Sequence, residues 1–161
     1  MFDRELKTFA FLHRYAGMLM ADVGDDERCA RPTPKATHAA WLIGHLATSH
    51  DRLGKMFGQP QRLDERWHEL FAPGATVEDD ASLYPGRDEL MAAYDAGHAA
   101  LPGVIAALPP EKLEEPTPHE RLRDALPTTG DLLTFILTGH EATHLGQLSA
   151  WRRGLGRDPL F

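Results

Sequence analysis

Apolar residues recur every three to four positions in four long stretches of the chain, which is the spacing of one face of an α-helix. The pattern predicts helices over residues 3–23, 37–57, 87–108 and 129–153. No comparable run of alternating apolar and polar residues indicates a sheet. We therefore expect an all-α fold, a four-helix bundle, in which metal sites are built from side chains on facing helices.

Turn-forming residues mark the expected helix ends. Thr37 is a plausible N-cap for the second helix, and Gly154 is expected to end the fourth. Pro102 lies inside the third helix and is expected to kink or shorten it. Two long connections, residues 58–86 and the proline-rich residues 109–127, remain between the helices. Connections of this length are usually functional, or they cover part of the fold.

The composition narrows the class of protein. A length of 161 residues with 42% hydrophobic content fits a single domain with one core, residues 1–161. The net charge of −7 and the lack of a basic run argue against a nucleic-acid partner. No apolar run approaches the ~20 residues of a membrane span. A single cysteine, Cys29, and a charged N-terminal segment lead us to expect a cytoplasmic protein without disulfides.

Three of the nine histidines fall on predicted apolar helix faces in a pattern that could bind a metal. His140 and His144 are four residues apart on the fourth helix, so they lie one turn apart on the same face. His45 lies among apolar neighbours on the second helix. These histidines could meet at one ion, although each could instead be an ordinary core histidine with one hydrogen bond.

His140, Glu141 and His144 also spell HExxH, the motif of a zinc metalloprotease helix. Such an enzyme needs a third protein ligand farther along the chain, and residues 145–161 contain no His or Glu. The motif is therefore interpreted as incidental. Glu141 is then expected to be a solvated helix acid at the edge of the apolar face, and it is at most a weak candidate for a catalytic base.

The other histidines receive more ordinary predictions. His38 lies seven residues before His45 and is a reserve fourth ligand. His13 and His98 fall near apolar faces, where a role in the core or at a pocket rim is expected. The remaining three histidines, His50, His68 and His119, are expected on the surface. Trp41 and Trp151 are expected in the core.

Two motifs, WLIGHLA at residues 41–47 and GHEATHLGQLSAWRRGLG at residues 139–156, resemble the DinB/YfiT-like family of metal-dependent enzymes. The resemblance covers nearly the whole chain. It implies a four-helix bundle, often a homodimer, in which a divalent metal is held by His45, His140 and His144. Zinc or nickel suits imidazole ligands best, with iron, cobalt or manganese as alternatives. Gln147, next to the motif, could support the site or bind a cofactor.

The family resemblance also implies a function. Members of the family whose chemistry is understood are thiol-dependent transferases or isomerases, in which the metal binds a low-molecular-weight thiol such as bacillithiol or mycothiol. The leading hypothesis is therefore metal activation of a small thiol for attack on a small-molecule electrophile, with residues 58–86 framing substrate entry. Two alternatives stay open: a metal-dependent hydrolase that uses metal-bound water, and a non-enzymatic metal-binding protein of a stress response.

Overall fold

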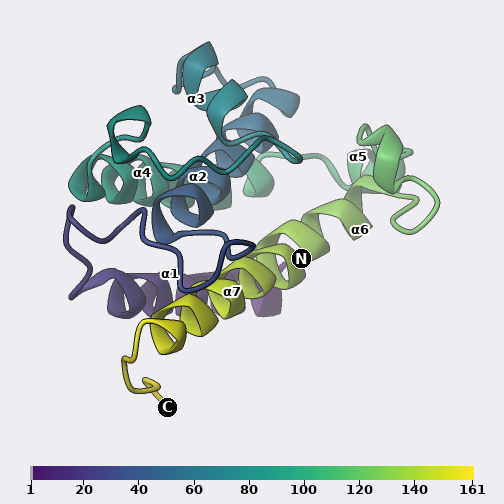
Figure 1. The fold of residues 1–161 in the computed structure, drawn as a ribbon. Helices are drawn as coiled ribbons and strands as arrows, with labels where there is room; N and C mark the ends of the chain where they lie inside the picture. The colour runs from purple at the N-terminus through teal and green to yellow at the C-terminus, as the bar shows by residue number, and fades with distance from the viewer. Residues whose placement is uncertain (1) are drawn as a thin grey trace.

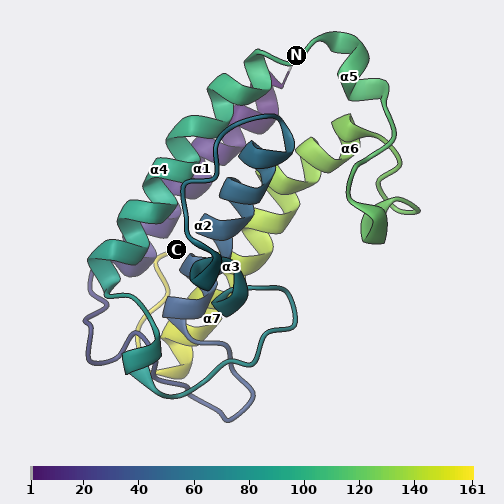
Figure 2. The same ribbon diagram turned by 90° about the horizontal axis from the view of Figure 1, so that it is seen from above.

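The structure is a computed structural model that describes residues 2–161. Four long helical segments lie side by side: α1 (Asp3–Met20), α2 (Ala39–Met56), α4 (Arg87–Ala106) and a composite fourth helix (Figures 1 and 2). The composite helix consists of α6 (Thr129–Thr134), η3 (Phe135–His140) and α7 (Glu141–Gly154). Within residues 2–161 the structure contains no β-strand, so the all-α prediction of a four-helix bundle is confirmed.

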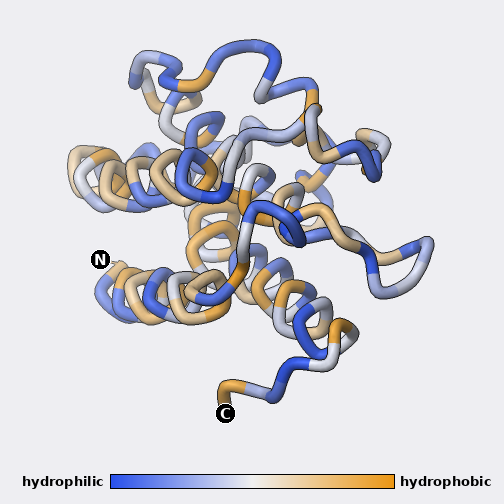
Figure 3. The backbone as a smooth tube through the Cα atoms, turned by 60° about the vertical axis from the view of Figure 1, so that its left-hand side comes forward, coloured by the Kyte–Doolittle hydropathy of each residue, from blue (hydrophilic) through white to orange (hydrophobic). Residues whose placement is uncertain are grey.

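The bundle is held together by apolar faces that meet between the four long helices. Helix α2 packs against both α4 and α7, and α1 packs against α4 and α7 on the other side. Figure 3 shows apolar residues concentrated along the long helices and polar residues in several connections. Trp41 and Trp151 are both buried in this core, as expected. No helix within the described residues is both long and apolar enough to cross a bilayer.

Two helix ends differ from the sequence prediction. The N-cap of α2 is His38, one residue after the predicted Thr37, because the His38 ring nitrogen Nδ1 accepts the Trp41 backbone N–H at 3.1 Å. Helix α4 continues past Pro102 and ends at Ala106, two residues before the predicted end.

Both long connections contain short helices. The first contains α3 (Glu65–Leu70) and the 3₁₀ turn η1 (Ala81–Leu83), and the second contains α5 (Pro110–Glu114) and η2 (Glu120–Leu122). The backbone N–H of Thr117 donates to the Pro127 carbonyl, and that of Thr129 donates to the Glu115 carbonyl, both at 2.9 Å. These two hydrogen bonds bring the ends of residues 117–127 together, so this segment forms a closed loop beside α6.

The middle of the composite helix is a π-helical segment, η3. A π-helix pairs each N–H with the carbonyl five residues earlier, so it shifts the helical register by about one residue relative to an α-helix. The π-segment ends at His140, directly before α7 begins at Glu141. Segments of this kind are rare and are frequently found at functional sites. The register shift therefore occurs at the first histidine of the fourth helix.

Candidate metal centre

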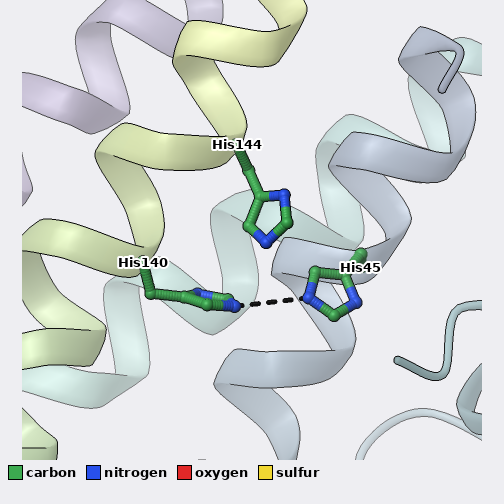
Figure 4. Close-up of side chains that lie close together, drawn as sticks. All are labelled: His45, His140 and His144. Carbon is green, nitrogen blue, oxygen red and sulfur yellow. Dashed lines mark hydrogen bonds between the residues drawn. The ribbon is translucent and has the colours of Figure 1, made fainter. Parts of the chain in front are cut away.

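The structure brings together the three histidines that the sequence placed on apolar faces. The rings of His45 from α2, His140 from the end of η3 and His144 from α7 point toward one another (Figure 4). One ring nitrogen from each lies within 4.8 Å of the other two. The Nε2 atoms of His45 and His140 are 3.3 Å apart. This spacing would let one ion between the rings reach all three nitrogens.

Hydrogen bonds fix the orientation of two of the rings. His45 Nδ1 donates to the Phe71 carbonyl at 2.9 Å, and His144 Nδ1 donates to the side-chain oxygen of Gln147 at 2.9 Å. With a proton on each Nδ1, the lone pair of each ring is on Nε2, which is how a metal-binding histidine is usually oriented. The Trp41 ring stacks on His45, with the two planes inclined by only 7°.

The site keeps its imidazoles uncharged. Burial lowers the pKa of His45 to about 4 and that of His140 to about 3, and it also lowers the pKa of His144. All three rings are therefore neutral near pH 7, with lone pairs available to a cation. The buried Nδ1 of His140 has no hydrogen-bond partner among the described residues. Neutral nitrogens gathered in this way fit a divalent ion such as zinc or nickel.

A pocket of about 490 Å³ opens beside the three histidines, which is within the usual size range of small-molecule sites. Its walls come from α2, from α6 and η3, and from the 117–127 loop. Pro73 is the contribution of residues 58–86, which were expected to frame the entrance. Besides the three histidines and Pro73, the lining residues are Trp41, Ser49, Arg52, Leu53, Met56, His119, Arg121, Leu122, Leu132, Phe135 and Ile136.

Glu141 is buried, and the prediction of a solvated helix acid is wrong. Its side chain is fully inaccessible to solvent and accepts hydrogen bonds from His50 Nε2, at 3.0 Å, and from the Tyr94 hydroxyl. Burial by itself would raise the pKa of Glu141, but the His50 ring and the Tyr94 hydroxyl outweigh it and hold this pKa below its ordinary value. Glu141 does not line the pocket. It joins α7 to α2 and α4, because His50 and Tyr94 belong to those helices.

His50 was expected on the surface and is buried instead, as the partner of Glu141. A sequence signal for this was present: His50 follows Leu46 by four residues and precedes Leu53 by three, which places it on the apolar face of α2. His68 was also expected on the surface, but its side chain is only 10% exposed, and its Nε2 lies 3.0 Å from Asp51. His119 is half-buried and lines the pocket.

The remaining histidines lie outside the three-histidine cluster. His38 caps α2, and its Nε2 donates to the Glu78 carbonyl at 3.1 Å, so both ring nitrogens are engaged and the reserve-ligand prediction is wrong. His98 stacks on Phe9 and donates to the Phe9 carbonyl at 3.0 Å, which is the core role expected for it. His13 is half-buried, with Nε2 2.7 Å from an Asp95 carboxylate oxygen.

Comparison with known proteins identifies the family of this chain. The family model of the DinB superfamily matches residues 10–148. No curated protein matches the sequence. Among solved structures, a chain described as the conserved protein of locus from Enterococcus faecalis is 19% identical, covers 98% of both chains and superimposes with a TM-score of 0.76. That likeness shows a shared fold. The matched segment spans most of the chain and includes His45, His140 and His144. The chain therefore belongs to the DinB superfamily.

Proposed function

We propose that this protein is a metal-dependent enzyme that activates a small thiol for transfer to an electrophile, with His45, His140 and His144 as the metal ligands. One observation carries the proposal: three neutral imidazoles converge at the wall of a largely apolar pocket of small-molecule size. A site made for stability alone would not require a pocket beside it.

The protein's own residues would hold and shield the reacting groups. The Phe71 carbonyl and Gln147 keep the rings of His45 and His144 in position. The stacked Trp41 ring and the apolar pocket wall exclude water from one side of the site. A divalent ion held by His45, His140 and His144 would stabilise the thiolate, the nucleophilic form of a thiol.

Hydrolysis is the weaker alternative, because the pocket contains no carboxylate that could act as a base for water. Its lining includes no Asp or Glu, and both oxygens of Glu141 are engaged by His50 and Tyr94 outside the pocket. A thiol would need less assistance than water, because its ordinary pKa of about 8.5 is far below that of water, so a bound divalent ion would let it release its proton to solvent near neutral pH.

The test is electrophile consumption by untagged protein that has been stripped of metal and then supplied separately with zinc, nickel, iron, cobalt or manganese. We expect turnover that requires both a metal and a thiol. The His144→Ala variant should lose it, and His13→Ala, which removes a histidine outside the cluster, should keep it. The proposal fails if no metal supports thiol-dependent consumption. Equal turnover with and without thiol would favour the hydrolase.

A further inference from the structure

The pocket beside the three histidines has a charge balance opposite to that of the whole chain. The protein contains 24 acidic and 17 basic residues, for a net charge of −7. None of the pocket-lining residues is an Asp or Glu, whereas two of them, Arg52 and Arg121, are arginines. A cavity lined with cations and without anions attracts negatively charged ligands, even in an acidic protein. The occupant of this pocket should therefore carry negative charge.

Arg52 is positioned to bind that charge. It follows His45 by seven residues on α2, so its backbone lies two turns farther along the same face, about 10 Å at 1.5 Å per residue. One guanidinium nitrogen donates to the His68 carbonyl at 2.6 Å, which holds the group in place. Arg52 forms no ion pair with any carboxylate of residues 2–161. Its remaining N–H groups could bind an anion with fork geometry.

Arg121 brings a second cation to the pocket from the 117–127 loop. It belongs to η2, in the segment whose ends are held together by the backbone hydrogen bonds of Thr117 and Thr129. Like Arg52, it makes no ion pair within the part of the chain that the structure describes. An anion in the pocket would therefore have two arginines available from separate elements.

Most of the remaining pocket surface is apolar. It is formed mainly by aliphatic and aromatic side chains of α2, α6 and η3, which are Leu53, Met56, Leu132, Phe135 and Ile136. Such a wall favours a hydrocarbon segment over a fully polar molecule, because burying apolar surface stabilises the complex by about 25 cal/mol per Å². The pocket thus combines nitrogen ligands, an apolar wall and two arginines.

We propose that the pocket binds an amphipathic anion, with its acidic group at Arg52 and Arg121, its apolar part against the wall, and its far end at the three histidines. This inference rests on the proposed function for the role of that far end. The anionic group belongs either to the thiol or to the electrophile, since either reactant can extend from the histidines toward the arginines.

The binding test uses metal-free protein, so that it does not depend on the metal site or on turnover. Hexanoate and its uncharged isostere hexanamide are titrated calorimetrically at low ionic strength, where charge interactions are least screened. We expect hexanoate to bind about tenfold more tightly, the effect of a charge-assisted hydrogen bond in a half-buried site. Arg52→Met and Arg121→Met should each reduce that preference. Arg153→Met, which removes an exposed arginine of α7, should preserve it.

The inference is overturned if hexanoate binds no more tightly than hexanamide, or if Arg153→Met reduces the preference as much as the pocket variants do. Circular dichroism identifies a variant that fails to fold, and the exposed position of Arg121 makes its variant the safer of the two.

A second arm of the test uses the metal-loaded enzyme to locate the acidic group. Thiols and electrophiles are compared in pairs that differ only in one carboxylate. Removing the carboxylate from the reactant that carries the anion should raise its KM. The Arg52→Met substitution should abolish that rise. The inference fails if neither reactant depends on its carboxylate. Absence of all turnover would refute the proposed function and leave the binding result intact.

Discussion

Replacing Glu141 by alanine should destabilise the protein far more than removal of an exposed acid. The substitution leaves the Tyr94 hydroxyl and the His50 ring buried without their partner. Each buried polar group that loses its hydrogen bond costs about 1–3 kcal/mol, so two predict a loss of about 2–6 kcal/mol.

Such a loss is a large part of the total stability of a domain, which is about 5–15 kcal/mol. Urea unfolding followed by circular dichroism, at one fixed protein concentration, measures it directly. The melting temperature should fall by about 2–4 °C for each kcal/mol lost. Glu69→Ala, which removes an exposed acid of α3, is the matched control and should stay within about 0.5 kcal/mol of the wild type.

The Glu141→Gln variant separates a structural role from a catalytic one. Glutamine still accepts the Tyr94 hydroxyl, and its amide can donate to the other tautomer of His50, so most of the stability should remain. If Glu141 only joins the helices, this variant also keeps its turnover. The reasoning is refuted if Glu141→Ala is as stable as Glu69→Ala. A stable Glu141→Gln variant without turnover would restore the base role.

Three further predictions concern contacts elsewhere in the protein. Gln147→Leu removes the acceptor that orients His144 and should weaken metal binding about tenfold or more, measured by competition with a chelator. Gly44→Ala should cost about 1–3 kcal/mol in urea unfolding, because the new methyl group would lie 2.3 Å from the buried Phe71 ring. Burial lowers the pKa of His98 to about 4, so its stabilising contribution is present above pH 6.5 and lost as the pH falls toward 4; urea midpoints should decrease over that window.

Each of these predictions has a control or a contradicting result. Gln59→Leu changes an exposed glutamine and should leave metal affinity unchanged. Gly17→Ala, on α1, meets no atom within 4 Å and should be neutral or stabilising; an equal loss in both glycine variants would contradict the clash with Phe71. His98→Phe should reduce the acid sensitivity, and an unchanged pH profile would show that this histidine does not contribute.

The fold and the three-histidine cluster could both be predicted because each depends on helical periodicity. His140 and His144 share a face through their four-residue spacing, and His45 lies on the apolar stripe of another helix. When the apolar stripes of two helices face each other, inward side chains at the same level must meet. The homodimer, the cytoplasmic location and the single-domain organisation remain predictions from the sequence.

The buried acid could not be predicted because its burial depends on partners from distant segments. Glu141 is stable in the core only because His50 and Tyr94, 91 and 47 residues away, reach it from two other helices. Hydrophobic periodicity shows which face of a helix is apolar, and it does not show which polar groups across the core pair with each other.

The π-helical segment η3 and the role of the 117–127 loop could not be predicted from the sequence, for related reasons. The register shift in η3 is a one-residue change in hydrogen bonding, which leaves no clear signal in the apolar pattern. The 117–127 loop contacts the pocket through His119, Arg121 and Leu122, but only the closed backbone path brings them there. The sequence favoured residues 58–86 as the frame of the pocket entrance. Within the described residues, this connection contributes one lining residue, Pro73.

The central claim, that His45, His140 and His144 hold a divalent ion, is tested most directly by elemental analysis of untagged protein after metal loading and extensive dialysis. We predict one divalent ion per chain in the wild type and in His13→Ala, and loss of that ion in His45→Ala and in His144→Ala. A wild-type protein that retains no metal, or a His144→Ala variant that retains the wild-type amount, would contradict the account.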